Sequence, residues 1–490
     1  MRLDALLPGE ARGQAVDLAA LSLDSREVRA GGAFLACRGE RHHGLDFLPQ
    51  ALARGATAVL WEPVADRPAP QLPPGVASVA VPDLARRAGD IAARFFGDPS
   101  AALRVVGITG TNGKTTCAWL VAQALEATGR PAAYIGTLGA GRRGTVQPGT
   151  HTTPDAVSLQ RLLAQFRDAG ATHVAMEVSS HALVQARAAA VRFAAAVLTN
   201  LSRDHLDFHG SMENYAAAKA SLFERAEVSL RVVNADDDLG RRLLARYADA
   251  IAVSPSGAWR DEGTRPFLQA GDVAIDDGGL SFELQSSFGQ RRVRVPLIGA
   301  FNLANALTVL GVLLGLDIDL DTAVDAIGRV DAPPGRMQRF GGGERAPLVA
   351  VDYAHTPDAL EKALQALRVH AAGRLWCVFG CGGDRDRGKR PQMGAIAARF
   401  ADEVVVTDDN PRSESPAAIV ADILEGMGSH PVRVVHDRAA AIASAVLGAA
   451  PGDAVLVAGK GHESVQVVGR EQRPFSDADA VRAALARRDA

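Results

Sequence analysis

Hydrophobic residues cluster along the chain in short strand-like runs that alternate with longer helical segments. Up to about residue 100 the runs are short, and a proline-rich stretch at 63–75 interrupts them. Several runs between 101 and 335 are apolar without alternation, which is typical of strands buried on both faces of a parallel sheet. The strand-like runs in these two parts are 33–37, 56–61, 76–81, 103–110, 172–180 and 193–200.

Helical and antiparallel patterns lie between these strands. Residues 115–129 predict a helix that ends at Gly129, and residues 212–226 are helical by propensity. Residues 266–296 differ, because "RRVRVPL" alternates polar and apolar positions, and they predict a small antiparallel insert. The stretch "DAPPGRMQ" at 331–338 is rich in turn residues and predicts a linker.

Beyond the linker, each strand-like run is followed by a helical or loop segment, which is the signature of a parallel doubly wound sheet. These runs are 347–353, 374–380, 403–409, 432–437 and 454–459. We therefore expect an α/β protein of three domains. They are a smaller N-terminal α/β domain (1–100), a central domain with a mostly parallel sheet (101–335) and a Rossmann-like doubly wound C-terminal domain (336–490).

Composition excludes several classes of protein. A chain of 490 residues exceeds what one ordinary core supports, which agrees with several domains. Its net charge of −3 argues against non-specific binding to nucleic acid or membranes. No apolar run approaches the ~18 residues of a membrane span, and the N-terminus lacks the pattern of a secretory signal. Cys377 and Cys381 have no second pair to complete a zinc site, so we expect reduced thiols in a cytoplasmic protein.

Lysine is scarce in this chain. The 53 basic residues include five lysines, which are Lys114, Lys219, Lys362, Lys389 and Lys460. Arginine is therefore the default cation. A retained lysine indicates a need for a compact ammonium, or for an amine that can lose its proton, which arginine cannot supply.

The strongest chemical signal is "GITGTNGKTT" at 107–116. A strand leads into a glycine-rich turn that opens a helix, so backbone N–H groups and the helix dipole face an anion. The generic phosphate-loop pattern requires glycine where Ile108 stands, so the match misses by one position. Lys114 would neutralise the β- and γ-phosphates, and Thr115 or Thr116 could hold Mg²⁺. The loop predicts that the central domain is P-loop ATPase-like.

Other residues fit nucleotide chemistry but also have ordinary explanations. Glu177 and His205 follow buried strands, at the edge of a parallel sheet where nucleotide metals bind. Glu177 could equally cap a helix, and His205 could be a core histidine. Lys219 lies among alanines and could be an exposed helix lysine. The stretch "HTTPD" at 151–155 could be a helix N-cap, because Thr followed by Pro and Asp suits capping.

Together the motifs resemble those of the Mur ligase family, the ATP-dependent amide ligases of peptidoglycan precursor assembly. They occur in family order over essentially the whole chain as "LDSREV", "GTNGKTT", "MEVSSHAL", "TNLSRDHLDFHG", "GAFNLANAL", "DYAHTPDAL", "GCGGDRDRGKR", "DDNPR" and "GKGHE". The resemblance implies that ATP phosphorylates a carboxylate and that an amine attacks the acyl phosphate, which splits one hard step into two easier ones. It also implies Mg²⁺ as a cofactor.

The resemblance implies roles for individual residues. Catalysis would depend on Lys114, Glu177, His205 and Lys219. The metal ligands would be Thr115, Glu177, His205 and Lys219. Lys219 would act as N6-carboxylysine, a carbamate that forms when a neutral amine adds CO₂. The ATP contacts would be Gly110, Thr111, Asn112, Gly113, Lys114, Thr115, Thr116, Asn302, Asn305, Arg336 and Asp352.

The resemblance further implies a UDP-binding N-terminal domain, a central ATP-binding ligase domain and an amino-acid-binding C-terminal domain. The contacts to the UDP-muramoyl peptide would be Leu23, Ser25, His42 in the 40–42 loop, Thr152, Thr153, Ser179, Gln185 and Arg187. The contacts to the amino acid would be Arg385, Asp409, Asn410, Pro411, Arg412, Gly459 and Glu463.

The combination of "LDSREV" with "DNPR" implies addition of meso-diaminopimelate to the D-glutamyl γ-carboxylate of UDP-MurNAc-L-Ala-D-Glu. Asn-Pro in "TDDNPRSE" predicts a turn, which on this resemblance would aim Arg412 at the distal carboxylate, while Asn410 or Asp409 would take the neighbouring ammonium. Three alternatives stay open, namely an L-lysine-adding ligase, a folylpolyglutamate synthase and an ATP-dependent regulator without ligase chemistry. We expect a monomer that acts on small molecules, with no nucleic-acid partner.

Overall fold

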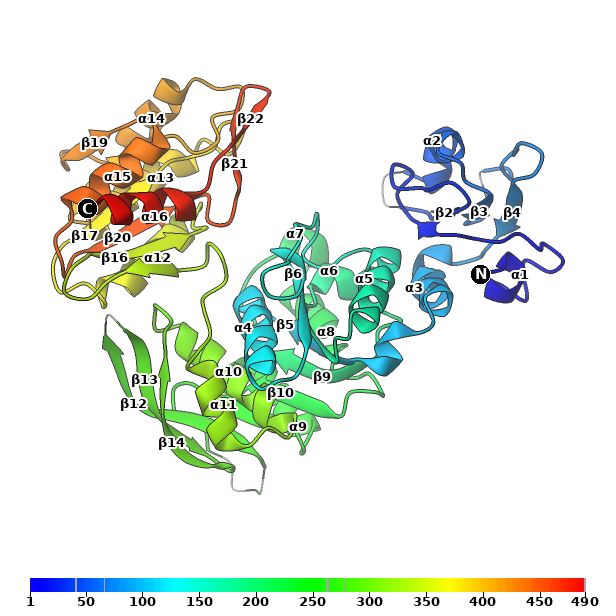
Figure 1. The fold of residues 1–490 in the computed structure, drawn as a ribbon, viewed down its shortest axis with the longest axis horizontal. Coiled ribbons are helices and arrows are strands. Elements are labelled where there is room, and N and C mark those ends of the chain that lie inside the picture. Colours follow the sequence, from blue (N-terminus) through cyan, green and yellow to red (C-terminus); the bar gives the residue numbers. More distant parts are fainter. Residues whose placement is uncertain (40–41, 66, 261–262, 264, 277, 489–490) are drawn as a thin grey trace. The chain divides into compact units, whose positions relative to one another are not determined.

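Figure 1 shows the helices and strands in order along the chain. The described residues divide into two compact units, 1–252 and 253–490. The structure is a computed structural model that describes residues 1–39, 42–65, 67–260, 263, 265–276 and 278–488. Within these residues, no helix is both long enough and apolar enough to cross a membrane. The three domains expected from the sequence stay a prediction, because the compact units are divided once, after Ala252.

The first unit begins with a small parallel sheet. Its elements are α1 (Leu3–Leu6), β1 (Leu21–Ser22), β2 (Ala33–Ala36), η1 (Gly44–Phe47), α2 (Leu48–Ala53), β3 (Ala58–Trp61), β4 (Ala77–Ala80), α3 (Leu84–Phe95) and η2 (Pro99–Ala102). The strands pair in parallel in the order β1-β2-β3-β4. Leu35 packs in the core that includes α3, whereas Phe34 packs in the core that includes Ala51 of α2. Strands β2 and β3 are therefore buried on both faces, which explains why they are apolar without alternation, whereas the edge strand β4 exposes Ser78 and Ala80.

A second, larger sheet follows in the same unit. Its elements are β5 (Arg104–Thr109), α4 (Lys114–Ala127), β6 (Ala132–Gly136), β7 (Gly139–Gly141), α5 (Ala156–Asp168), β8 (His173–Glu177), α6 (Ser180–Val184), β9 (Phe193–Leu198), α7 (Leu206–His209), α8 (Met212–Ala220), β10 (Leu230–Asn234) and α9 (Asp238–Arg246). The strands of this sheet between residues 104 and 234 lie in the order β10-β9-β5-β8-β6-β7, with β7 antiparallel and the others parallel. The carboxyl ends of β5, β8 and β9 consequently meet at one edge. The predicted helix at 212–226 is shorter than expected, because α8 ends at Ala220.

The second unit begins with the predicted antiparallel insert. Strand β11 (Ile251–Ser254) crosses the boundary between the units. The insert consists of β12 (Phe267–Asp276), β13 (Gly279–Ser286) and β14 (Gly289–Val295), which pair antiparallel and confirm the prediction. Helices α10 (Asn302–Gly315) and α11 (Leu320–Ile327) follow.

The rest of this unit is a doubly wound α/β fold, as predicted. Its elements are β15 (Gln338–Gly341), β16 (Leu348–Asp352), α12 (Pro357–Arg368), β17 (Leu375–Phe379), α13 (Lys389–Phe400), β18 (Glu403–Val406), α14 (Pro416–Leu424), β19 (Val432–Val434), α15 (Arg438–Gly448), β20 (Ala454–Ala458), β21 (Val465–Val468), β22 (Glu471–Pro474) and α16 (Asp477–Arg488). The sheet order is β15-β16-β20-β17-β18-β19, parallel apart from β15. Leu456 packs with α12–α14 on one face, and Val455 packs with α15 and α16 on the other. The hairpin β21–β22 was not predicted.

Candidate active site

The phosphate loop joins β5 to α4 at the carboxyl edge of the larger sheet in the first unit. Gly110 and Gly113 have φ values of 148° and 83°, in the region that glycine adopts most readily. A Cβ atom on Gly110 would lie 1.9 Å from Thr199 Oγ1, so a larger residue does not fit there. The amino end of α4 follows directly, and the positive end of its helix dipole favours an anion.

Two lysines bind the same carbonyl of this loop. Lys114 Nζ donates to the carbonyl oxygens of Gly110 and Thr111, each at 2.9 Å, and Lys219 Nζ donates to that of Gly110 at 2.7 Å. Lys219 is 1% exposed, so the alternative that it is an exposed helix lysine is wrong. Burial, together with the charge of Lys114, lowers the pKa of Lys219 to about 6. Its amine is therefore mostly neutral near pH 7, which is the state that adds CO₂.

Glu177 ends β8 with a buried carboxylate whose two oxygens both accept hydrogen bonds. Oε1 accepts from Tyr134 Oη at 2.6 Å and from the Thr137 backbone N–H at 2.8 Å. Oε2 accepts from Thr115 Oγ1 at 2.9 Å and from Thr137 Oγ1 at 3.2 Å. Tyr134 and Thr137 were not predicted as site residues. Nothing in a short apolar strand indicates that its tyrosine reaches a carboxylate on another strand.

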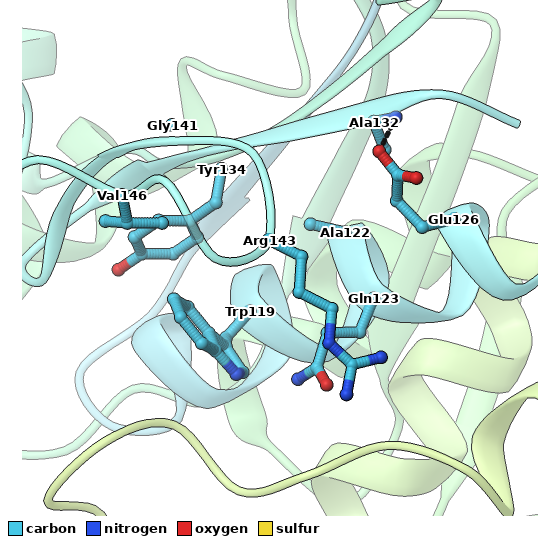
Figure 2. Close-up of a pocket in the computed structure, with 9 residues that line it drawn as sticks. All are labelled: Trp119, Ala122, Gln123, Glu126, Ala132, Tyr134, Gly141, Arg143 and Val146. Atoms are coloured by element: carbon cyan, nitrogen blue, oxygen red, sulfur yellow. Dashed lines mark hydrogen bonds between the residues drawn. The ribbon is translucent and has the colours of Figure 1, made fainter.

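Tyr134 also lines a small pocket. Its ring lies edge-on to that of Trp119 on α4, with centroids 5.3 Å apart, and Figure 2 shows the two side chains next to each other. The pocket is lined by Trp119, Ala122, Gln123, Glu126, Ala132, Tyr134, Gly141, Arg143 and Val146. This packing restrains the Tyr134 ring, and hence the direction of the hydroxyl that binds Glu177.

Tyr215 connects His205 to the phosphate loop. His205 begins α7 with a φ of 52°, and its side chain is 46% exposed, so the alternative that it is a core histidine is wrong. The rings of His205 and Tyr215 have centroids 6.1 Å apart. The Tyr215 hydroxyl lies 3.1 Å from Thr111 Oγ1, and Lys219 Nζ lies 4.3 Å from the centre of its ring. Tyr215 was also missed by the sequence analysis, although it precedes Lys219 by one helical turn.

Oxygen donors suited to a divalent cation meet at this edge. The Thr115 hydroxyl binds Glu177, and a carbamate on Lys219 would add two further oxygens. Hard oxygen ligands are those that Mg²⁺ prefers, whereas a histidine such as His205 is an unusual ligand for it. Among the described residues, no cluster of three or more His, Cys, Asp and Glu side chains could hold a metal. The donors present fit Mg²⁺ if hydroxyl, carbamate and phosphate oxygens complete its coordination.

The "HTTPD" segment packs against the same strand end. Thr153 is fully buried, and its hydroxyl donates to the Glu177 carbonyl oxygen at 2.8 Å and accepts from the Ser179 N–H at 3.1 Å. The N-cap of α5 is Asp155, whose carboxylate accepts two backbone N–H groups at 3.0 Å. The prediction that this segment caps a helix is therefore confirmed, but the capping residue is Asp155 and not a threonine. Thr152 Oγ1 lies 3.0 Å from Thr137 Oγ1.

The other residues predicted to contact the muramoyl peptide, Ser179, Gln185 and Arg187, lie at α6 and just after it. Ser179 caps α6 by accepting from the Ala182 N–H, so Glu177 is not that helix's cap. Arg187 donates to the Thr153 carbonyl oxygen at 3.1 Å and also to the Gln185 side chain.

The residues predicted for the uridine end lie in the small N-terminal sheet region. Ser25 is buried and donates to Gln50 Oε1 at 2.7 Å. His42 is exposed and packs edge-on against Phe47, with ring centroids 5.9 Å apart. Within the described residues no hydrogen bond joins Leu23, Ser25 and His42, and residues 40–41 of that loop lie outside the described part of the chain.

The second unit holds the remaining predicted ATP contacts. Asn302 begins α10 and donates to the Ile298 carbonyl oxygen at 2.7 Å, and Asn305 donates to Asn302 Oδ1 at 2.7 Å. Asp352, at the end of β16, accepts from the Met337 N–H at 2.8 Å, and burial raises the pKa of its carboxyl. Arg336 lies next to Met337 in the chain, so Arg336 and Asp352 are brought close together.

Predicted acceptor residues gather at the carboxyl edge of the second unit's sheet. Asn410 is buried and donates to Glu463 Oε2 at 2.8 Å, while its Oδ1 accepts from Lys460 Nζ at 2.9 Å. Lys460 is fully buried and also donates to Glu463 at 2.8 Å. A Cβ atom on Gly459 would lie 2.7 Å from Asp409 Oδ2, which places these two residues in direct contact. The structure thus uses the Asn410 side chain to hold Lys460 and Glu463. Lys460 had no predicted role. The feature of the sequence that could have identified it is the scarcity of lysine, because Lys460 is one of five lysines in the chain.

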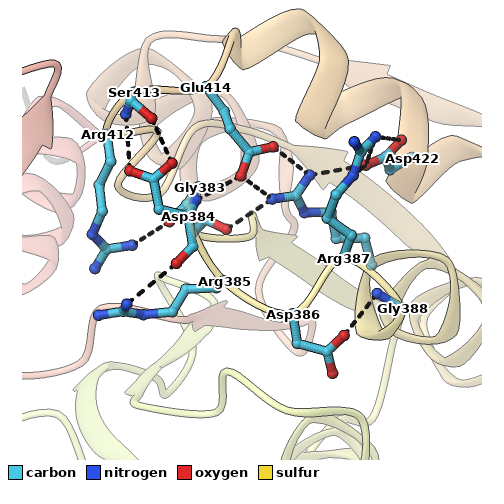
Figure 3. Close-up of polar contacts among 12 residues, drawn as sticks. Gly383, Asp384, Arg385, Asp386, Arg387, Gly388, Arg412, Ser413, Glu414 and Asp422 are labelled. Carbon is cyan, nitrogen blue, oxygen red and sulfur yellow. Dashed lines mark hydrogen bonds and ion pairs between the residues drawn. The ribbon is translucent and has the colours of Figure 1, made fainter.

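The two predicted arginines flank Gly382. A Cβ atom on Gly382 would lie 2.8 Å from Arg412 Nη1 and 3.7 Å from Arg385 Cγ. Arg412 has a φ of 50° and donates through Nη1 to the Gly383 carbonyl oxygen at 2.8 Å. Figure 3 shows both arginine side chains running toward the same side of the loops. A Cβ atom on Gly383 would lie 1.9 Å from the Pro411 carbonyl oxygen, so the two loops touch through their backbones.

Comparisons with known proteins cover nearly the whole chain. Family models match at residues 17–96 (Mur ligase family, catalytic domain), 108–313 (Mur ligase middle domain) and 335–461 (Mur ligase, glutamate ligase domain). A Pseudomonas aeruginosa protein named UDP-N-acetylmuramoyl-L-alanyl-D-glutamate–2,6-diaminopimelate ligase is 50% identical over 468 residues, which are 95% of this chain and 94% of that protein. A protein of the same name from Xanthomonas campestris pv. campestris (strain 8004) is 51% identical over 488 residues, which are 99% of this chain and 97% of that protein.

Solved structures show the same similarity. A structure titled as this 2,6-diaminopimelate ligase aligns with a TM-score of 0.73 and 36% identity, over 100% of this chain and 99% of that chain. The MurF ligase from Thermotoga maritima in complex with ADP aligns with a TM-score of 0.63 over 96% of this chain and 98% of that chain. At 19% identity, the second similarity concerns the fold alone.

Proposed function

The chain belongs to the Mur ligase family, and on that premise we propose that it joins meso-diaminopimelate to the D-glutamyl γ-carboxylate of UDP-MurNAc-L-Ala-D-Glu. The reaction is ATP-dependent and forms an amide. Relatives that share half of their residues with this chain over nearly its full length are named for this reaction.

The observation that carries the proposal is the charge pattern of the acceptor site. Meso-diaminopimelate has an ammonium and a carboxylate at each end, so it needs a cationic group that lysine does not need. Arg385 and Arg412 flank Gly382, and the acidic groups of Asp409 and Glu463 lie near Asn410 in the same fold. We assign the distal carboxylate to the two arginines and the neighbouring ammonium to the acidic groups.

The first unit supplies the groups for acyl activation. The γ-phosphate of ATP would be transferred to the substrate carboxylate, and the acceptor amine would then attack the acyl phosphate and release phosphate. Both reactants of the first step are anions, so Lys114 and the amino end of α4 are needed to hold the triphosphate. We propose Mg²⁺ at the oxygen donors around Glu177, where it would supply further charge neutralisation. Lys219 would contribute its carbamate oxygens.

An acceptor panel tests the proposal. ADP release should require UDP-MurNAc-L-Ala-D-Glu together with meso-diaminopimelate, and L-lysine should support far slower turnover. Lysine leaves Arg412 without its carboxylate, and a charged hydrogen bond is worth roughly 1.5–3 kcal/mol, so discrimination by about 10⁴ is reachable when several such bonds are lost. Equal or faster turnover with L-lysine would overturn the assignment.

Two substitutions locate the discrimination. Arg412→Leu should raise the KM for meso-diaminopimelate and reduce the preference of the enzyme for meso-diaminopimelate over L-lysine. Arg399→Leu is the matched control, because Arg399 is also an arginine of the C-terminal fold but stacks on Phe400, with its guanidinium 5.0 Å from the ring centre. If both variants changed acceptor preference equally, Arg412 would not be the carboxylate reader.

The two alternative functions, a folylpolyglutamate synthase and a regulator without ligase chemistry, would need different parts of the chain. A folylpolyglutamate synthase does not need a UDP-binding module, whereas the described part of residues 1–100 includes a four-stranded sheet of its own. A regulator without ligase chemistry does not need an acceptor, and acceptor-dependent ADP release distinguishes it. We also propose that the protein is a cytoplasmic monomer, because its four cysteines form no disulfide in the described part of the chain and its substrates are small molecules. Size-exclusion chromatography with light scattering and cell fractionation test these two points.

A further inference from the structure

Two loops of the C-terminal fold are fastened to each other at the acceptor site (Figure 3). One follows β17 and carries Arg385, and the other follows β18 and carries Arg412. The Gly383 N–H donates to the Asn410 carbonyl oxygen at 2.9 Å, and Arg412 Nη1 donates to the Gly383 carbonyl oxygen at 2.8 Å. The Ser413 hydroxyl and N–H both donate to the Asp384 carboxylate, at 2.5 Å and 3.2 Å. The positions of the two arginines are therefore coupled.

A buried arginine holds both loops from behind. Arg390, on the first turn of α13, has a fully buried side chain. It binds the Glu414 carboxylate in a bidentate manner, with Nη2 to Oε1 at 2.8 Å and Nη1 to Oε2 at 2.9 Å. It also donates to Asp422 at 2.8 Å and to the Gly382 carbonyl oxygen at 3.2 Å. Two parallel bonds to one carboxylate fix direction as well as distance.

Glu414 is the point where this arginine meets the loops. It lies two residues after Arg412, and its Oε1 also accepts from the Asp384 N–H at 2.6 Å. The hydrogen bonds from Arg390 and from the Asp384 N–H lower the pKa of Glu414 to about 2, so its carboxylate stays charged at neutral pH. Arg390, Glu414, Asp422 and Asp384, called here the acceptor clamp, thus tie α13, α14 and both loops together.

The clamp acts on a backbone that would not hold its shape alone. Arg412 has a φ of 50°, which is unfavourable for a residue with a side chain and persists only when the surroundings over-determine it. Its N–H donates to the Val467 carbonyl oxygen at 3.0 Å, and its own carbonyl oxygen accepts from the Gly469 N–H at 2.7 Å. These bonds hold one side of the turn, and Glu414 holds the other.

We propose that Arg390, acting through Glu414, is a positioning residue for acceptor specificity. It does not contact the amino acid, but it sets the spacing of Arg385 and Arg412 and so matches them to the distal carboxylate of a diamino dicarboxylic acid. The proposal rests on the proposed function, since it concerns the same acceptor site. L-lysine, which has no distal carboxylate, gains nothing from this spacing.

Glu414→Gln in the full chain is the test. This substitution keeps the shape of a side chain that is 24% exposed and removes its charge, so folding should be retained. The apparent KM for meso-diaminopimelate should rise about 10-fold to 100-fold, the range that corresponds to losing one charge-assisted bond. The KM values for ATP and UDP-MurNAc-L-Ala-D-Glu should stay near those of the parent. The melting temperature should fall only slightly, because Asp422 still pairs with the buried Arg390 at 2.8 Å. The preference for meso-diaminopimelate over L-lysine should fall, and Glu414→Asp should recover part of it.

The matched control is Arg387→Gln. Arg387 is on the loop that carries Arg385, and it pairs with Asp422 at 3.1 Å. Its side chain is 65% exposed, and exposed ion pairs contribute little to stability. Its kinetic constants should match those of the parent. Arg390→Lys is a second test, because a single ammonium cannot bind Glu414 in the same bidentate manner, and it should reproduce the loss of acceptor preference.

The possible outcomes separate this inference from the proposed function. If the parent enzyme does not use meso-diaminopimelate, the proposed function fails whatever the variants do. If the parent uses it and Glu414→Gln keeps its KM and preference, the clamp does not set specificity. If Glu414→Gln lowers the melting temperature and raises all three KM values alike, its role is only structural and the inference is overturned.

Discussion

Lys219 offers the sharpest test of the proposed chemistry, because its reactivity depends on one measurable property of a buried amine. An ordinary lysine with a pKa of 10.5 is only about 0.1% neutral at roughly pH 7.5. The pKa of Lys219 is about 6, so most of its amine is neutral at that pH. Burial therefore increases the fraction able to add CO₂ by about three orders of magnitude.

The perturbation is Lys219→Ala in the full chain. Acceptor-dependent ADP release should fall by about 10²-fold to 10³-fold, the usual cost of removing one charge-stabilising group from an active site. Formate or acetate should restore part of the activity, because a small carboxylate can enter the space left by the side chain. Lys362→Ala is the control, since Lys362 is 66% exposed and pairs with Asp358 on the surface of α12. It should keep full activity and should not respond to acetate.

The carbamate can also be observed directly. Protein equilibrated with ¹³C-labelled bicarbonate should give a carbamate carbon signal in NMR spectra of the parent and of Lys362→Ala, but not of Lys219→Ala. Near-normal activity of Lys219→Ala, or an unchanged carbamate signal, would refute the reasoning and remove Lys219 from the mechanism.

The same buried amine predicts how stability depends on pH in CO₂-free buffer. The unfolded chain keeps the Lys219 proton up to a pKa of about 10.5, whereas the folded protein loses it near pH 6. Between these values the unfolded state binds more protons, so this group makes the free energy of unfolding rise with pH by up to about 1.4 kcal/mol per pH unit. Lys219→Met should remove this increment, which denaturant titrations at several pH values would measure. An unchanged slope in the variant would mean that the amine is not neutral in the folded state.

Two further substitutions test contacts of the described structure. Tyr134→Phe removes the hydroxyl that binds Glu177 and should weaken Mn²⁺ binding about 10-fold to 100-fold, measured by electron paramagnetic resonance titration. The control Tyr247→Phe should leave Mn²⁺ affinity unchanged. Equal affinities of the two variants would show that Tyr134 does not support the metal site. Arg438→Met leaves Asp477 buried without its partner and should cost about 3–5 kcal/mol of unfolding free energy, whereas the double variant with Asp477→Leu should cost less. Denaturant titrations measure the unfolding free energies of Arg438→Met and of the double variant. If the double variant lost as much unfolding free energy as the two single substitutions together, this account of the buried pair would be contradicted.

Much of the fold could be predicted from the sequence because its signals are local. The phosphate loop needs a strand, a glycine turn and a helix in immediate succession, and β5, Gly110, Gly113 and α4 follow in that order. Continuous apolar runs predicted parallel sheets, since both faces of those strands are covered. The predictions were less accurate where neighbouring residues suit the same local role. Thr153 suits an N-cap, but Asp155 takes that place and frees the Thr153 hydroxyl for the end of β8.

The tertiary structure alone decided which side chains share a site, because those contacts join residues far apart in the chain. Tyr134 reaches Glu177 across 43 residues, and Lys460 reaches Asn410 across 50. The short range of a hydrogen bond makes such pairs depend on strand order and register, which the hydrophobic pattern leaves open. The sequence by itself therefore determined the kinds of element and the chemistry available. Folding determined that Lys219 is buried beside Lys114, and burial is the physical reason that its amine is neutral and reactive.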